Sequence, residues 1–511
     1  IFYTPLTQLS STINPTATTI DVTSNLDFYK QILGPDNAYD SSIKTYLTIE
    51  DEVIEYPATG FGVNQFTSCT RGARGTTQVS HDGGADVSCS VQIEGNPIDI
   101  ALKLMLSGFN GPYIENLAIA NFYTSPDISV ESQSGLLVLP LNTDANRDYG
   151  IVPGDYLTIT GASIVANNTT CRVLQLLDLG DLPNNAIITD AIFSSEIDSA
   201  AVFSVRSQYD TFPNSCGVKL PSTEVDILRH KDIKATFLSS NQNDMRFYIN
   251  DTESSCKTFI ESQIYLPLGC YSLTRFGRLS MNLTHAPIAD DRLQFLTGEN
   301  VLNPQNIKPT RGVNNRKFFN QIEWIYDFYD DNQTAATTVK TLDTDSLNII
   351  GILSVLPITA KGMRTDLGNA PQIDRRTNFL LSRYKNGAVL LNLEVNWEVG
   401  SLIEAGDVVA IKDDGVLQIS NFVTGDRNLG TQLFEVINRD LDIKAGRVRL
   451  QVVSGLGAQV TDRYATISPS SIIQTGSTQT SLRLADSFGG KYPGQEFRKW
   501  LDYFGINILV H

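Results

Sequence analysis

The sequence predicts a mainly β, multi-domain protein made of β-barrel or β-sandwich domains with a few short α-helices. Short segments of alternating apolar and polar residues recur along the 511 residues, and 37 Gly and 20 Pro are scattered among them, as expected for many strands and turns. Helical spacing of apolar residues occurs in only a few short segments. Hydrophobic residues make up 41% of the chain, so each of the three or four domains expected at roughly 100–200 residues per domain can bury a core.

The N-terminal part of the chain is predicted to consist of strands and turns. The segment ATTIDVTS alternates, and KTYLTIEDEVIEY predicts a hairpin around the acidic turn Glu50-Asp51-Glu52. The strand ADVSCSVQI closes this unit near residue 93. The residues predicted to share a face within each strand are Ile20 with Val22, Leu47 with Ile49, and Ile54 with Tyr56. The next segment, NPIDIALKLMLSG, predicts a helix that starts at Asn96-Pro97 and ends at Gly108.

The middle of the chain is predicted to alternate between strands and one helix. Residues 115–206 contain strands, one of which follows the turn Gly154-Asp155, and the same pattern recurs before the strand in GDVVAI. Thr252 or Ser254 is predicted to cap a helix that runs through Ile264. Pro267-Leu268-Gly269 is expected to break this helix, and CYSLTRFGRLSM predicts a hairpin.

The C-terminal part is again predicted to be mainly β. Residues 318–360 are expected to form strands, including LDTDSLNIIGI, and IDRRTNFLLSRYKNG to form a helix with Phe379, Leu380 and Tyr384 inward. Four further strands are predicted in GAVLLNLEVNW, GDVVAIKDD, QLFEVINRDL and GRVRLQVVSG. The amphipathic segment YPGQEFRKWLDYFG predicts a last helix with Phe497, Trp500, Leu501 and Phe504 on one side.

Composition argues against several classes of protein. The net charge of −17 argues against a nucleic-acid-binding protein, because binding phosphate needs clustered Lys and Arg. It is compatible with a surface along which DNA passes, since like charges repel. The sequence has no secretory signal and no apolar segment of the roughly 20 residues that a membrane helix needs. No CxxC pair occurs, so we expect mostly buried, reduced thiols rather than a zinc site or a disulfide scaffold. The six cysteines are Cys69, Cys89, Cys171, Cys216, Cys256 and Cys270.

The sequence predicts no catalytic, cofactor-binding or metal-binding residues. The four histidines show no HxxxH spacing, and no GxSxG motif is present. Asp290-Asp291 and Asp330-Asp331 are interpreted as solvated loop ends, and Asp343, Asp345 and Ser346 as a turn without EF-hand spacing. The histidines are His81, His230, His285 and His511.

One polar segment, FTSCTRGARGTTQVSHDGGADV at residues 66–87, raises the question of a nucleotide-binding loop. It lacks the lysine of a P-loop and does not lead into an apolar helix. Its glycines permit positive φ, and Arg71 and Arg74 can bind carbonyls or carboxylates across a turn. We therefore predict a long turn whose arginines tie neighbouring strands or subunits together. His81 is interpreted as a loop histidine that hydrogen-bonds the backbone.

The hairpin YLTIEDEVIEY followed by this polar segment resembles a small module of tailed-bacteriophage tail and baseplate proteins. The resemblance covers roughly the first 95 residues and rests on the TRG, GTT and His elements. Across roughly residues 225–415, FIESQIYLPLGCYSLTRFGRLSM, GMRTDL, the FLLSRYKNG helix and GDVVAI resemble the baseplate or tail-tip hub family. The insertion near 115–206 has no counterpart in that pattern. The apolar end of the sequence suggests that the chain continues beyond residue 511.

The resemblance implies a structural, non-enzymatic virion protein of the bacteriophage tail. In the hub family, two tail-tube-like β-barrels per subunit form a trimeric ring that continues the tail tube and joins it to the host-contacting tip. The implied domains are a β module with the TRG and GTT turn (1–95), a hub segment (96–221) carrying an inserted β domain (about 115–206), a hub core (222–400), and a β-barrel-like domain with a C-terminal helix (401–511).

The resemblance also implies partners and a location, without any cofactor. The chain would assemble in the host cytoplasm as a homotrimer at the tail tip or baseplate, and take part in host attachment and DNA ejection. Its partners would be tail tube, distal tail or baseplate, and fibre or spike proteins, and the host envelope; viral DNA would pass through without specific binding. Two alternatives remain: a receptor- or carbohydrate-binding tail component, suggested by the β domain at 115–206, and a cell-wall hydrolase.

Overall fold

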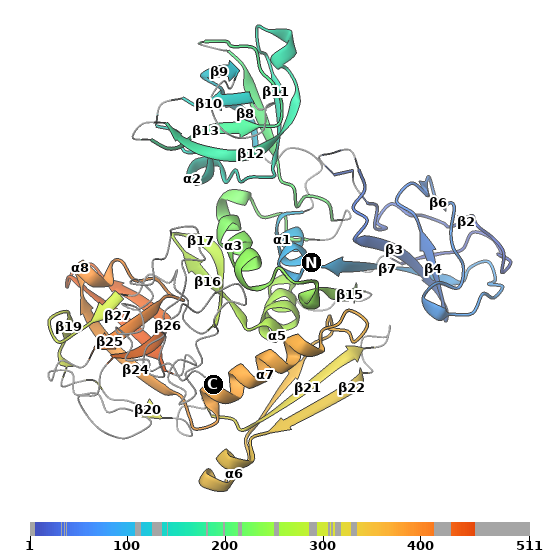
Figure 1. Ribbon diagram of the computed structural model, residues 1–511. Helices are drawn as coiled ribbons and strands as arrows, with labels where there is room; N and C mark the ends of the chain where they lie inside the picture. The colour runs from blue at the N-terminus through green and yellow to red at the C-terminus, as the bar shows by residue number, and fades with distance from the viewer. Residues whose placement is uncertain are drawn as a thin grey trace, which may run out of the picture. The chain divides into compact units, whose positions relative to one another are not determined.

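Figure 1 shows the computed structural model of the chain. It forms two compact units: the first is drawn from Ile1–Asn282, Trp324–Val339 and Ile358–Ile373, and the second from Leu283–Glu323, Lys340–Pro357 and Asp374–His511. The structure describes residues 6–31, 33–34, 36, 38–107, 114–124, 135–140, 142–179, 182–197, 200–212, 217–249, 255–285, 294–304, 307, 310–311, 318–328, 335–412 and 431–454.

The prediction of a mainly β, multi-domain fold is confirmed. Within the described residues the sheets contain five, seven, two, seven, three and three strands. The longest described helix has 15 residues, and none of the described helices is long and apolar enough to cross a membrane. The boundaries of the four domains drawn from the sequence remain predictions.

The N-terminal five-stranded sheet contains the predicted hairpin. Its central strand β7 pairs with β3 on one side and with β1 and β15 on the other, and β3 pairs with β4. The hairpin register places Leu47 opposite Ile54, and both side chains are fully buried, as the alternation predicts. A three-stranded sheet runs in the order β2-β6-β5. The strands are β1 (Leu6–Gln8), β2 (Ile20–Asp21), β3 (Ile43–Ile49), β4 (Glu52–Tyr56), β5 (Phe61–Gly62), β6 (Gln65–Phe66), β7 (Asp86–Gly95) and β15 (Met245–Ile249).

The first predicted helix is confirmed and a second was missed. Helix α1 (Pro97–Leu106) begins after Asn96, whose side chain accepts a hydrogen bond from the Ile98 amide, and it has Pro97 in its first turn. Helix α3 (Ile227–Phe237) was not predicted, because its sequence has little apolar periodicity; Asp226 caps it through the Arg229 amide. Two short helices flank α3, η3 (Ser222–Glu224) and η4 (Asn241–Asn243).

The helix predicted to run through Ile264 has different ends from those expected. Ser255 caps it, and the predicted caps Thr252 and Ser254 lie outside the described residues. Pro267 does not break the helix, because proline is tolerated in a first helical turn and Pro267 lies in the first turn of α5. The helix ends only at Gly269, with φ 84°. The successive segments are α4 (Cys256–Phe259), the π-helical η5 (Ile260–Tyr265) and α5 (Leu266–Leu268). The predicted hairpin follows as β16 (Cys270–Arg275) and β17 (Arg278–Leu283).

A seven-stranded antiparallel sheet covers residues 114 to 206. It has its own core, in which Phe122, Leu157 and Phe203 are buried. The order is β8 (Ile114–Ala118), β14 (Val202–Arg206), β11 (Tyr156–Thr160), β12 (Thr170–Leu179), β13 (Leu182–Thr189), β10 (Gly135–Val138) and β9 (Asn121–Thr124). Two short helices connect its strands, α2 (Ala145–Tyr149) and η2 (Val165–Asn167).

The strand predicted over residues 342–352 is wrong. Its central part forms the helix α6 (Thr344–Ile350), because Asp343 caps a helix by accepting a hydrogen bond from the Ser346 amide. Asp343 and Ser346 therefore belong to a cap rather than to the turn predicted from the sequence. The strands before and after this helix belong to one three-stranded sheet. Its strand order is β22 (Ala335–Leu342), β21 (Gln321–Phe328) and β23 (Val355–Thr359).

The second unit is built around another seven-stranded sheet, which contains the four predicted strands. Its buried face includes Phe434, Val448 and Leu391. The order is β18 (Gln294–Leu296), β25 (Val408–Lys412), β26 (Thr431–Asp442), β27 (Arg447–Val453), β24 (Val389–Asn396) and β19 (Val301–Leu302), with β20 (Thr310–Arg311) also pairing with β24. Its described helices are α6, α8 (Trp397–Gly400) and the part of α7 (Ala370–Tyr384) from Asp374 onward.

Helix α7 confirms the predicted helix but only part of its predicted buried face. Leu380 is buried, whereas Phe379 and Tyr384 are half-buried. The predicted C-terminal helix with Phe497, Trp500, Leu501 and Phe504 lies outside the described residues. The five described cysteines are buried and form no disulfide with one another, and Cys216 lies outside the described residues.

Candidate functional site

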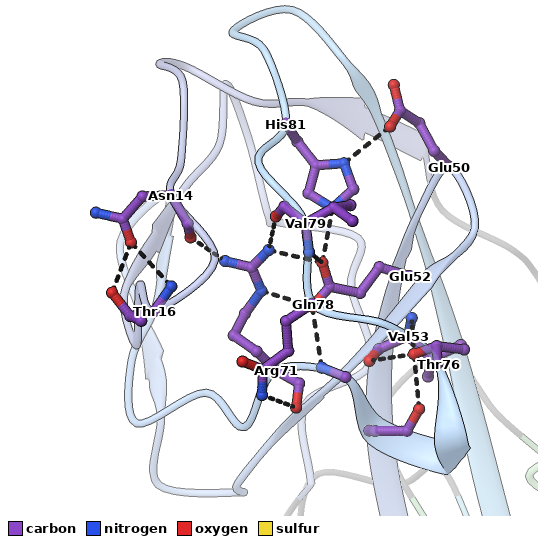
Figure 2. Close-up of polar contacts among 12 residues, drawn as sticks. Asn14, Thr16, Glu50, Glu52, Val53, Arg71, Thr76, Gln78, Val79 and His81 are labelled. Carbon is purple, nitrogen blue, oxygen red and sulfur yellow. Dashed lines mark hydrogen bonds and ion pairs between the residues drawn. The ribbon is translucent and has the colours of Figure 1, made fainter.

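The polar segment between β6 and β7 folds back onto the β3–β4 hairpin and encloses a buried carboxylate. Glu52, the first residue of β4, has a fully buried side chain. The turn before it is tight, with Glu50 at φ 51°. Figure 2 shows that the residues around Glu52 come from both the hairpin and the polar segment. A carboxylate at this depth requires partners that compensate for the loss of water.

Arg71 supplies the main compensation for the Glu52 charge. Its Nε lies 2.7 Å from Glu52 Oε1, and its Nη2 lies 2.6 Å from Glu52 Oε2, which is a bidentate ion pair (Figure 2). The same guanidinium donates to the carbonyl oxygens of Asn14 and Val79. Arg71 therefore binds three separate segments of the chain, and its side chain is 3% exposed.

His81 completes the cluster on the opposite side of the carboxylate. Its Nε2 lies 2.8 Å from Glu52 Oε2, and its Nδ1 lies 3.0 Å from Glu50 Oε2. The prediction that the His81 side chain hydrogen-bonds the backbone is wrong, because the ring bridges two carboxylates of the hairpin turn. The backbone of His81 does pair with that of Ile13, in an isolated β-bridge.

Two backbone amides also donate to the carboxylate. The amide of Gly72 lies 2.9 Å from Glu52 Oε1, and the amide of Val79 lies 3.2 Å from Glu52 Oε2. Burial alone would raise the pKa of Glu52, but the hydrogen bonds from Arg71, His81 and these amides outweigh it and lower that pKa from 4.5 to about 2. Glu52 is thus held as an anion.

We expect acid to destabilise the chain through Glu52. Because the pKa of the folded state lies below the ordinary value of 4.5, the contribution of Glu52 is complete above about pH 4.5 and is lost as the pH falls towards 2. It amounts to at most roughly 3 kcal/mol in the free energy of unfolding. Denaturant unfolding measured across this pH window should show the loss. Glu52→Gln should flatten the dependence; equal slopes for the two chains would contradict the assignment.

Arg74 binds a different pair of strands. Its backbone has φ 56° inside the short helix η1 (Ala73–Gly75). Its guanidinium carbon lies 3.7 Å from the centre of the Tyr248 ring on β15, and its Nη1 lies 2.6 Å from Gln92 Oε1 on β7. The prediction that these arginines tie neighbouring strands together is therefore confirmed for Arg74, whereas Arg71 binds β4 and two segments outside the strands; a contact with other subunits stays a prediction.

The cluster has the properties of a structural clamp. Glu52, Arg71 and the His81 ring are all buried, and the charged groups of Glu52 and Arg71 bind each other and the backbone. Neither Arg71 nor Arg74 lies in an open site that could bind phosphate. In the part of the chain that the structure describes, no group of three or more His, Cys, Asp or Glu side chains could hold a metal ion.

The remaining candidates from the sequence do not join this cluster. His230 is buried in α3, where Nδ1 lies 2.7 Å from the Asp226 carbonyl oxygen and Nε2 lies 3.0 Å from the Tyr265 hydroxyl. Burial lowers the pKa of His230, so its ring is neutral in the core. The acidic pairs Asp290-Asp291 and Asp330-Asp331, and His511, lie outside the described residues.

Sequence reasoning missed the central residue of the cluster. Glu52 was assigned to an acidic turn together with its exposed neighbour Asp51. A usable signal was its position at the start of a strand, two residues before the buried Ile54 and on the same face. An acid on the inward face of a strand needs a cationic partner, and the arginines of the following segment were the available donors.

Comparisons with known proteins give distant structural likenesses. No protein-family model and no curated protein matches the chain. A chain of the virion of a native gene transfer agent particle has a TM-score of 0.31 and 11% identity, with the match covering 72% of this chain and 95% of that chain. The 43 kDa tail protein of prophage MuSo2 from Shewanella oneidensis has a TM-score of 0.24 and 11% identity, covering 89% and 99%.

A third likeness is to a tail protein from Neisseria meningitidis MC58, with a TM-score of 0.26 and 11% identity, covering 59% of this chain and 92% of that chain. These three solved structures are virion or tail proteins. At such low TM-scores and identities, the likenesses assign neither a family nor a function to this chain.

Proposed function

We propose that the chain is a structural component of a bacteriophage tail, at the baseplate or tail-tip hub. In this proposal it forms a trimeric ring that continues the tail tube and joins it to the host-contacting tip. The sequence motifs described above support the proposal, together with a mainly β fold in several sheets. The proposed domains are those drawn from the sequence, with boundaries near residues 95, 221 and 400.

The observation that carries the proposal is the clamp around Glu52. The polar segment at residues 66–87 uses its Arg71 and His81 side chains and the Gly72 amide to bind Glu52 of the hairpin in a buried site. Such an arrangement holds strands in place and leaves neither the His81 ring nor the Arg71 guanidinium open to a substrate. A segment of this kind serves assembly better than catalysis.

Charge and sheet edges support the same function. A net charge of −17 repels DNA, as a conduit that DNA crosses without binding requires. The described sheet of β22, β21 and β23 ends in β22 and β23, whose outer edges can pair with another chain. In the proposed ring these edges join copies of the chain, tail tube and distal tail or baseplate proteins, and fibre or spike proteins.

The proposal predicts a trimer without hydrolytic activity. Light scattering of the purified chain should give three times the mass of one chain, and particle images should place a tagged chain at the tail tip with threefold symmetry. Incubation with purified peptidoglycan should release no fragments. A stable monomer that hydrolyses peptidoglycan would overturn the proposal in favour of a cell-wall hydrolase.

A further inference from the structure

The outward face of the second unit's sheet carries ordered rows of polar side chains. The strand register aligns β24, β27 and β26 so that side chains from the three strands lie side by side. In one row, Asn392, Gln451 and Asn438 are neighbours, and Gln451 Nε2 lies 3.1 Å from Asn392 Oδ1. This amide row stands on the face opposite the buried Leu391 and Val452.

A charged row lies next to the amide row. Arg449 on β27 stands between Glu394 on β24 and Asp440 on β26. Arg449 Nε lies 3.3 Å from Glu394 Oε1, and Arg449 Nη1 lies 3.3 Å from Asp440 Oδ2. These three side chains carry a net charge of −1, and Arg449 forms an ion pair with the carboxylate on each side of it.

A β-bulge brings β26 into line with the other two strands. The register shifts between Val436 and Asn438, so that two residues of β26 occupy one step of β27. Up to Val436 the even-numbered side chains face the core, and after the bulge Asn438 and Asp440 face outward. Without this shift, both side chains would point into the apolar core. The bulge is therefore what assembles the two rows.

The two rows form the floor of a cavity of about 440 Å³. This volume lies within the roughly 300–1,000 Å³ typical of small-molecule sites. Leu302 at the end of β19, Asn303 and Ile307 supply a wall. Asn303 Nδ2 lies 3.4 Å from Glu394 Oε2, which links wall and floor. The wall is partly apolar and the floor is polar.

We propose that this cavity binds a neutral saccharide. Planar amide, carboxylate and guanidinium groups offer many donors and acceptors at fixed positions, which suits a ligand with several hydroxyl groups. Neighbouring strands lie about 4.8 Å apart, comparable to the width of one sugar ring. Leu302 and Ile307 can cover the apolar C–H face of such a ring. The net negative charge of the floor disfavours anionic sugars and phosphates.

This site goes beyond the structural function proposed above and can be tested separately. Saturation-transfer difference NMR on the intact chain would use maltotriose and chitotriose as neutral probes and 3′-sialyllactose as an anionic probe. We expect signal transfer to at least one neutral probe and none to the anionic probe. Asn438→Ala and Gln451→Ala should each weaken binding about tenfold, the loss of a good hydrogen bond.

Asn378→Ala is the matched control, because Asn378 is exposed on α7 in the same unit and does not line the cavity. It should leave both binding and the thermal midpoint unchanged. Asn438→Trp, which places a bulky ring over the amide row, should abolish binding while the thermal midpoint stays that of the unchanged chain. The proposal is overturned if neither neutral probe binds, if the anionic probe is preferred, or if binding survives Asn438→Trp. None of these results bears on the trimer.

Discussion

Replacing Arg71 by alanine is expected to destabilise the N-terminal β module by about 3–5 kcal/mol. The substitution leaves Glu52 buried and ionised without the bidentate partner whose nitrogens lie 2.6 and 2.7 Å from its oxygens. It also removes the donors to Asn14 and Val79, so the polar segment loses part of its attachment to the hairpin. Hydrogen exchange of the intact chain should report the loss as faster exchange of the Gly72 and Val79 amides.

The double variant Arg71→Met/Glu52→Gln separates the buried charge from the packing. It removes both charges, so it should recover a substantial part of the stability lost in Arg71→Ala. Arg172→Ala is the control, because Arg172 is exposed on β12. If Arg71→Ala exchanges no faster than Arg172→Ala, the ion pair does not hold this segment.

The strands were predictable where alternation matched burial. In the β3–β4 hairpin, Leu47 and Ile49 lie on one face of β3, and the register places Leu47 against Ile54 in the core. Helix α1 was predictable because Asn96 and Pro97 are strong start signals. Both features depend on residues close in sequence. Local patterns were therefore sufficient for these elements.

Prediction from apolar spacing failed where a polar residue determines the local structure. The segment LNII after Asp343 reads as a strand, but the Asp343 cap satisfies the Ser346 amide and starts α6. The candidate site failed for a related reason. Glu52 and His81 are 29 residues apart, and only the fold brings Glu52 Oε2 within 2.8 Å of His81 Nε2. No spacing rule links such residues.

The same contrast separates the two polar sites of the molecule. Around Glu52, backbone amides and side chains enclose the charge and leave it 0% exposed. On the sheet of the second unit, Asn392, Asn438 and Arg449 are exposed and line a cavity. A buried cluster contributes to stability and shape, whereas an exposed row of fixed polar groups can also bind a ligand. For this reason, the first site stabilises the N-terminal module, and the second is the one proposed to bind a ligand.

Replacing Arg383 by alanine is expected to destabilise the second unit by about 3–5 kcal/mol. Arg383 lies on α7 with its side chain 1% exposed, and its Nη1 lies 2.8 Å from Glu435 Oε2 on β26. Its Nε also donates to the Ser454 carbonyl oxygen at 3.3 Å, so one side chain attaches the helix to two segments of the sheet region. Denaturant unfolding of the intact chain should show the loss.

The reason for the large effect is the carboxylate left behind. Glu435, whose side chain is 4% exposed, would lose its cation and keep the Thr284 hydroxyl, which lies 3.2 Å from Oε1. Arg383→Met/Glu435→Gln removes both charges and should recover part of the stability. Arg375→Ala, at an exposed position of the same helix, should change stability by less than about 1 kcal/mol. Equal losses for Arg383→Ala and Arg375→Ala would show that the buried pair does not hold α7 to the sheet.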